Sequence, residues 1–76
     1  MELLFYTRPD CHLCDEAEDL LRAVAPGQAV TFVDIEDSIA LLDRYGVRIP
    51  VLRREPDGQE LGWPFDADQL QGFLAG

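Results

Sequence analysis

Two cysteines, Cys11 and Cys14, stand three residues apart where a helix is expected to begin. Backbone N–H groups are unpaired at a helix start and the helix dipole is positive there, so a thiolate on Cys11 would be stabilised. The spacing of three residues brings Cys14 round to the same side of the first turn. These residue types at this spacing predict thiol–disulfide exchange, in which Cys11 is the nucleophile and Cys14 is the more buried resolving thiol.

Metal or haem binding would need residues that this chain lacks. A structural zinc site has four ligands, whereas Cys11, Cys14 and His12 supply at most three and the sequence has no further His or Cys. Covalent haem attachment needs a histidine directly after the second cysteine, and that position holds Asp15. We therefore predict no metal site. Two buried, inert cysteines are the remaining alternative, although that interpretation does not explain why the pair falls at a helix start.

Several charged or aromatic side chains near the pair have both a functional and an ordinary interpretation. A charged His12 would favour the thiolate or carry a proton, whereas a histidine at an exposed helix start is usually only solvated. Arg8 would receive an anionic substrate, or it would pair with one of the 15 acidic residues. Trp63 would form a wall of a substrate groove, or it would pack a loop. The acidic residues after Cys14 would form a solvated helix face, or they would favour a basic partner.

The cysteines need a strand before them and a helix after them, and the sequence predicts both. Leu3–Tyr6 is a short, continuous apolar run, which is typical of a strand buried on both faces. From Cys11 to Val24 the apolar residues recur at helical spacing, and Pro26-Gly27 ends the pattern. The apolar face of this helix is predicted to consist of Leu13, Ala17, Leu20, Leu21 and Val24.

The rest of the chain predicts a second strand and helix, a hairpin and a last helix. Val30–Val33 indicates another buried strand, and Ile39–Tyr45 a short helix with N-cap residues before it and Gly46 after it. Residues 51–54 and 59–62 flank a Glu-Pro-Asp-Gly turn and predict an antiparallel hairpin. Asp66 is expected to cap the last helix.

This order of elements predicts an α/β fold, β-α-β-α-β-β-α, with a four-stranded mixed sheet and three helices. We expect residues 1–76 to form a single domain, because a chain of 76 residues holds one modest core.

Residues 6–14 with their Cys-x-x-Cys, the Val47–Val51 segment and the Pro-Asp-Gly turn resemble a glutaredoxin-like protein of the thioredoxin-fold superfamily. The resemblance covers essentially the whole chain and implies a thioredoxin-like (glutaredoxin-type) fold. It also implies that Pro50 follows a cis peptide bond and faces the cysteines, and that Ile49 binds the substrate backbone.

The same resemblance suggests further site residues. Arg8 matches the basic residue that faces the glutathione carboxylate in the family, and His12-Leu13 replaces the usual Pro-Tyr between the cysteines. Arg48-Ile49 takes the place of a Thr-Val pair. The family's Gly-Gly and Asp-Asp motif is matched in part by Gly62, Trp63 and Asp66. We therefore predict substrate binding by Arg8, His12, Leu13, Arg48, Ile49, Pro50, Gly62, Trp63 and Asp66.

The resemblance and the cysteine pair together predict a glutaredoxin-like thiol–disulfide oxidoreductase. No organic cofactor is expected, and the dithiol would be regenerated by glutathione or by a flavoprotein reductase after it reduces a protein or low-molecular-weight disulfide. The alternative is a non-catalytic thioredoxin-fold module for interaction, or for a metal or iron–sulfur cluster shared across a dimer through Cys11.

Charge and hydropathy exclude several other classes of protein. The chain has 6 basic and 15 acidic residues and a formal net charge of −9, so we expect no nucleic-acid binding and no docking on anionic lipid. No apolar run approaches the ~20 residues of a membrane-spanning helix. From the first residues we expect no signal peptide, and two cysteines are too few for a secreted disulfide scaffold. We therefore expect a cytoplasmic monomer.

Overall fold

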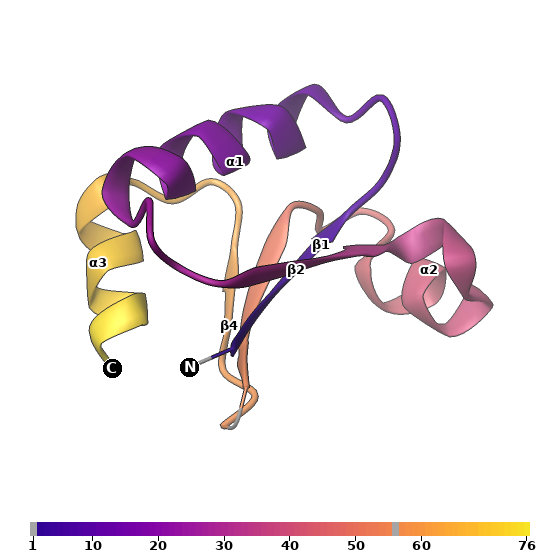
Figure 1. The fold of residues 1–76 in the computed structure, drawn as a ribbon. Helices are drawn as coiled ribbons and strands as arrows, with labels where there is room; N and C mark the ends of the chain where they lie inside the picture. Colours follow the sequence, from indigo (N-terminus) through magenta and orange to yellow (C-terminus); the bar gives the residue numbers. More distant parts are fainter. Residues whose placement is uncertain (1, 56) are drawn as a thin grey trace.

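The computed structural model describes residues 2–55 and 57–76, which form four strands, three α-helices and one 3₁₀ turn (Figure 1). In chain order these are β1 (Glu2–Thr7), α1 (His12–Val24), β2 (Val30–Asp34), the 3₁₀ turn η1 (Ile35–Asp37), α2 (Ile39–Tyr45), β3 (Val51–Glu55), β4 (Glu60–Gly62) and α3 (Ala67–Ala75). The predicted order of strands and helices is confirmed.

The four strands form one mixed sheet in the order β2-β1-β3-β4. Strand β1 runs parallel to β2 and antiparallel to β3, and β3 is antiparallel to β4. Val51 lies beside Tyr6 on one side and beside Gly62 on the other. The end of β1, the start of β3 and the end of β4 therefore meet at one edge of the sheet, where the segments that hold the cysteines, Pro50 and Trp63 emerge.

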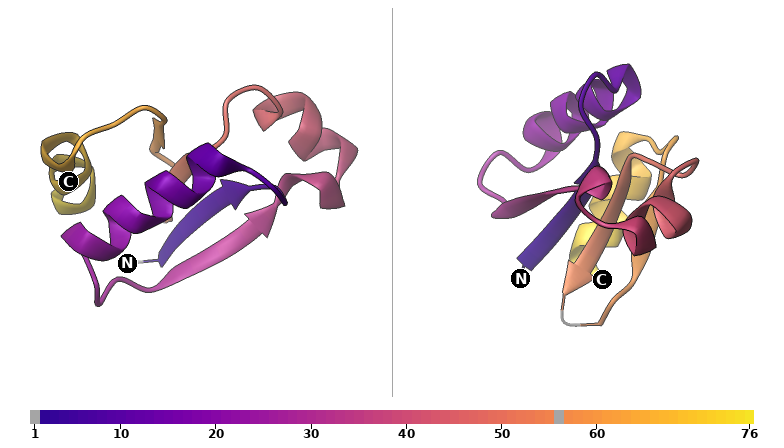
Figure 2. Two further views of the ribbon diagram at one scale, coloured as in Figure 1. Left: turned by 90° about the horizontal axis from the view of Figure 1, so that it is seen from above. Right: turned by 90° about the vertical axis from the view of Figure 1, so that its right-hand side faces the viewer.

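Each face of the sheet carries its own hydrophobic cluster, because successive residues of a strand point to opposite faces. On one face Leu3 and Phe5 of β1 pack with Leu21 of α1 and Leu70 of α3, all of them buried. We refer to this as the helix-side cluster, and it also includes Cys14, Ala17, Leu52 and Phe65. The opposite face buries Tyr6, Ile35, Tyr45 and Val51. Helices α2 and α3 lie at opposite ends of the molecule (Figures 1 and 2).

Helix starts are fixed by side-chain caps. Ser38 caps α2, where its hydroxyl accepts a hydrogen bond from the Leu41 N–H. Asp66 caps α3 as predicted: its carboxylate accepts from the Gln69 N–H at 2.8 Å, and the Gln69 side chain accepts from the Asp66 N–H at 2.9 Å. This reciprocal pair satisfies donors that a helix start otherwise leaves open.

The hairpin also forms as predicted, with β3 and β4 antiparallel. Gly58 adopts a φ of 72°, a conformation that glycine adopts at little steric cost. Asp57 stabilises the turn by accepting a hydrogen bond from the Gln59 N–H at 3.1 Å. Pro56, the proline of the predicted turn, lies outside the described residues.

Two predictions of burial are wrong. Strand β2 has no fully buried residue, since it is an edge strand with β1 as its neighbour, and Phe32 rests against Phe5 while staying 43% exposed. Leu13 is 47% exposed, because Cys14 rather than Leu13 begins the buried stripe of α1. In α2, for which no buried face was predicted, Tyr45 is buried and Ile39 is 80% exposed.

No helix in the described part of the chain is long and apolar enough to cross a bilayer.

Candidate active site

The two cysteines form a disulfide at the start of α1, with their Cα atoms 5.2 Å apart. Cys11 is the N-cap of this helix: its carbonyl accepts from the Asp15 N–H at 3.2 Å, and its sulfur accepts from the Cys14 N–H at 3.1 Å. The Cys11 sulfur thus occupies the position where a helix start stabilises negative charge. This geometry is suited to a thiolate when the pair is reduced.

The two sulfur-bearing residues differ in exposure. Cys14 is 4% exposed and belongs to the helix-side cluster, whereas Cys11 lies at the margin of that cluster and is only partly buried. An external disulfide would therefore reach Cys11 more readily than Cys14. Asp10, directly before the pair, has a φ of 59°, and Asp tolerates this left-handed conformation better than most residues do.

The segment before β3 lies at the same edge of the sheet. The Ile49–Pro50 peptide bond is cis, and Pro50 is buried. The Pro50 carbonyl accepts a hydrogen bond from the Trp63 N–H at 3.1 Å. Ile49 and Trp63, like Cys11, pack against the helix-side cluster, and the Trp63 ring meets Phe65 edge to face at 5.0 Å. Ile49 and Trp63 therefore lie against the cluster that contains Cys14, and Pro50 is joined to Ile49 by the cis peptide bond and to Trp63 by the hydrogen bond.

Three predicted residues next to the cysteines point outward. Arg8 forms an ion pair with Glu36 of η1 at 2.7 Å, and both side chains are about half exposed. His12 is 87% exposed, with its Nε2 3.3 Å from Glu16, one turn along the helix. Leu13 also lies on the surface. These side chains are available to a partner, but the structure does not direct them at the sulfurs.

The remaining predicted residues have evident structural contacts. Arg48 donates a hydrogen bond to Glu60 at 3.0 Å. Gly62 is exposed at the end of β4, and Asp66 is engaged in capping α3. Whether any of these residues contacts a substrate stays a prediction.

A model of the glutaredoxin-like domain family (DUF836) matches residues 2–75. The chain belongs to this family. The resemblance inferred from the Cys-x-x-Cys, the Val47–Val51 segment and the hairpin is thereby confirmed.

Solved structures of other proteins share the fold of this glutaredoxin-like chain. It is 51% identical to the structural-genomics target protein XcR50 from X. campestris, with a TM-score of 0.86 over 96% of this chain and 95% of that one. Protein Ne2328 from Nitrosomonas europaea is 28% identical, with a TM-score of 0.80 over 95% and 88% of the two chains. Thioredoxin 1 from Thermosipho africanus TCF52B is 10% identical, with a TM-score of 0.65 over 99% and 96%, and shows the thioredoxin-like fold alone. No curated protein matches the chain.

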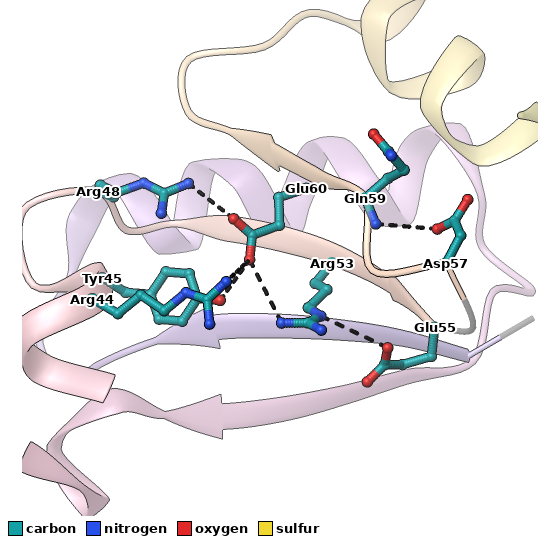
Figure 3. A network of polar contacts seen from close by, with 8 residues as sticks. All are labelled: Arg44, Tyr45, Arg48, Arg53, Glu55, Asp57, Gln59 and Glu60. Carbon is teal, nitrogen blue, oxygen red and sulfur yellow. Dashed lines mark hydrogen bonds and ion pairs between the residues drawn. The ribbon is translucent and has the colours of Figure 1, made fainter. Parts of the chain in front are cut away.

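Sequence reasoning missed one feature of this glutaredoxin-like chain: a polar network around Glu60 of β4 (Figure 3). The Tyr45 hydroxyl donates to Glu60 at 2.5 Å, and Arg44, Arg48 and Arg53 surround the same carboxylate. Burial and the hydrogen bond to Glu60 raise the pKa of Tyr45 to about 12. No local sequence pattern predicts this network, because its residues come from separate helices and strands.

Among residues 2–55 and 57–76, no group of three or more His, Cys, Asp or Glu side chains is placed to hold a metal ion.

Proposed function

We propose that this glutaredoxin-like chain is a thiol–disulfide oxidoreductase. The observation that carries the proposal is the Cys11–Cys14 disulfide at the start of α1, with Cys11 partly exposed and Cys14 in the core. Such a pair combines an accessible sulfur at a thiolate-stabilising position with a second sulfur held beside it.

The reaction follows from these two positions. The Cys11 thiolate attacks one sulfur of a substrate disulfide, the substrate S–S bond breaks, and one substrate thiolate leaves with a proton from solvent. The Cys14 thiolate then attacks the Cys11 sulfur of the mixed disulfide and releases the second substrate thiol. The substrate gains two electrons and two protons, and the Cys11–Cys14 disulfide forms. An external thiol reductant restores the dithiol.

Substrate contacts are assigned to the residues at the same edge of the sheet. Ile49 and Trp63 lie beside the cluster that holds Cys14, and Leu13, between the two cysteines in sequence, is exposed to a substrate that approaches the pair. Arg8 supports glutathione as one reductant, because an exposed ion pair such as Arg8–Glu36 contributes only about 0–1 kcal/mol and an incoming carboxylate can replace Glu36. A flavoprotein reductase is the other reductant of the proposal.

The proposed active unit is a monomer of one domain, residues 1–76, acting in the cytoplasm. Its two cysteines fit a redox pair in a reducing compartment better than a secreted scaffold held by several disulfides.

The experiment is reduction of insulin, and of a mixed disulfide of a small thiol, measured through NADPH oxidation in two separate systems. One contains glutathione and glutathione reductase, and the other contains thioredoxin reductase. Turnover that depends on the wild-type protein in at least one system is expected, and Cys11→Ser should abolish it. Rates that are no higher with wild type than with Cys11→Ser in both systems would reject the proposal.

A further inference from the structure

Three of the six basic residues of this acidic chain lie around one carboxylate, that of Glu60. Its Oε1 accepts from Arg48 at 3.0 Å, and its Oε2 accepts from the Tyr45 hydroxyl at 2.5 Å (Figure 3). Arg44 and Arg53 lie 3.8 and 3.9 Å from Oε2. The Glu60 side chain is only 17% exposed, and the Arg53 side chain 28%, whereas the Arg48 and Arg44 side chains are 46% and 59% exposed. The carboxylate itself is therefore better shielded from water than that of an ordinary surface ion pair.

The surroundings of Glu60 favour its charged form. Burial by itself would raise the pKa of this carboxyl, but the hydrogen bonds from Tyr45 and Arg48 and the charges of Arg48 and Arg44 outweigh burial and lower the pKa. Arg53 faces Glu60 from β3 and also lies 3.7 Å from Glu55. An ionised Glu60 thus joins the end of α2 to β3 and β4.

The contacts of Glu60 continue into the segment that carries Pro50. The Tyr45 ring is buried and stacks on Tyr6 with 4.2 Å between the centroids. The Tyr45 carbonyl accepts from the N–H groups of Arg48 and Ile49 at 2.8 and 3.1 Å. The Arg48 guanidinium lies 5.3 Å from the centre of the same ring. Glu60 therefore holds, through Tyr45 and Arg48, the two residues directly before Pro50.

This segment has little apolar packing of its own at its tip. Val47 is completely exposed, and Arg48 is also on the surface. On its other side the segment is fixed by the hydrogen bond from the Trp63 N–H to the Pro50 carbonyl. Trp63 follows β4, three residues after Glu60, so strand β4 anchors both ends of the segment.

We propose that Glu60 is a positioning residue for disulfide exchange at Cys11. It acts through Tyr45 and Arg48 and holds Ile49 and Pro50 in place at the sheet edge where the disulfide lies. A substrate that docks there meets a preformed backbone, which lowers the cost of binding. The assignment rests on the proposed function, because it concerns binding of a disulfide substrate to the same site.

The test compares Glu60→Gln with Glu55→Gln, a matched control on β3. Glutamine keeps the size of Glu60 but removes the charge that holds Arg48, whereas Glu55 contacts Arg53 and not the segment before Pro50. For a peptide disulfide, Glu60→Gln should raise KM about tenfold with kcat changed by less than about twofold, the pattern of lost binding. Glu55→Gln should leave both constants unchanged.

Two further measurements separate positioning from general loss of stability. Amide hydrogen exchange at Arg48 and Ile49 should be at least about tenfold faster in Glu60→Gln than in Glu55→Gln, while core amides stay protected. The rate of Cys11 alkylation by iodoacetamide, which does not need the substrate surface, should equal that of wild type. Tyr45→Phe removes the hydroxyl but keeps the stacked ring, and it should change KM in the same direction.

Unchanged KM and unchanged exchange at Arg48 and Ile49 in Glu60→Gln would overturn the assignment, even if that variant melts at a lower temperature. If Glu60→Gln does not fold, the same readings on Tyr45→Phe decide. Wild-type protein without any turnover would overturn the proposed function and the positioning role with it. Wild-type turnover with equal KM values in all variants would overturn the positioning role alone.

Discussion

At the scale of single residues, Trp63 is the natural reporter of the cysteine pair. It is the only tryptophan of the chain, and it packs against the cluster that contains Cys14. Sulfur commonly packs on aromatic rings at ~5 Å, and a disulfide this close to an indole ring can quench its fluorescence by contact. Formation of the Cys11–Cys14 disulfide should therefore lower the emission of Trp63. Reduction with dithiothreitol is therefore expected to increase Trp63 fluorescence, with far-UV circular dichroism almost unchanged.

The control for this response is Cys14→Ser, which cannot form the internal disulfide and should show no change on reduction. Identical emission spectra of the oxidised and reduced wild-type protein would mean that Trp63 does not sense the pair. The case for Trp63 as a wall of the substrate surface would then fail.

Asp66 illustrates how one residue can have a structural and a functional interpretation. Its carboxylate caps α3, so Asp66→Ala should destabilise the fold by about 1 kcal/mol. For a domain of this size, that loss lowers the melting temperature by roughly 4–8 °C. Asparagine caps about as well as aspartate, so Asp66→Asn should melt close to wild type.

Activity distinguishes the two roles of Asp66. If it acts only as a cap, Asp66→Asn keeps the wild-type KM for a disulfide substrate. A higher KM in Asp66→Asn, at unchanged melting temperature, would instead assign its charge to substrate binding.

At the scale of elements, the link between α2 and β4 predicts a dependence of stability on alkaline pH. Burial and the hydrogen bond to Glu60 raise the pKa of Tyr45 from its ordinary value of 10.0 to about 12. Folding therefore favours the protonated phenol. This contribution to the free energy of unfolding is complete below about pH 10 and is lost as pH rises from 10 towards 12.

Urea unfolding at several pH values between 9 and 12 measures this effect. We expect the free energy of unfolding of wild type to fall more steeply across this window than that of Tyr45→Phe, which has no proton to lose at this position. Equal slopes for the two proteins would show that Tyr45 does not contribute.

Most elements were predictable from the sequence because their signals are local. The apolar run of β1, the Pro-Gly after α1, the hairpin turn and the Asp66 cap each lie within a few residues of the structure that they determine. The helix-start position of Cys11 was predictable for the same reason, since a strand and a helical pattern flank it directly.

What could not be predicted depends on contacts between distant segments. Strand β2 is only partly buried because it lies at an edge of the sheet, and the apolar run of Val30–Val33 does not determine the order of the strands. The exposure of Leu13 depends on which side of α1 meets the sheet. Glu60 and Tyr45 are 15 residues apart, and each alone has the sequence pattern of an ordinary strand or helix residue.

At the scale of the whole molecule, charge should select among substrates. All six arginines contact carboxylates, and the partners are Glu18, Glu36, Glu55, Asp57 and Glu60. The net charge of −9 is therefore carried largely by other acids, among them Asp10 and Asp15 on either side of the cysteine pair. A cationic disulfide should be attracted to this surface and an anionic one repelled.

This selectivity can be measured with cystamine and 3,3′-dithiodipropionate, which are similar in size and opposite in charge. The rate at which the reduced protein reacts with each disulfide is divided by the rate at which neutral dithiothreitol reacts with the same disulfide. This ratio should be about tenfold higher for cystamine at low salt. The preference should shrink at 1 M salt, where the screening length falls to about 3 Å. A preference for the anion would show instead that Arg8 and Arg48 dominate the field at the site.

The exchange of disulfides at Cys11 is tested most directly by mass spectrometry of single-cysteine variants. Reduced Cys14→Ser and Cys11→Ser are incubated with glutathione disulfide or a peptide disulfide, and each adduct is located by peptide mapping. We predict one mixed disulfide on Cys11 in Cys14→Ser, no adduct on the buried Cys14 in Cys11→Ser, and an internal disulfide in wild type. Adducts on Cys14 with none on Cys11 would reverse the assigned roles, and unmodified protein in all three samples would contradict disulfide exchange altogether.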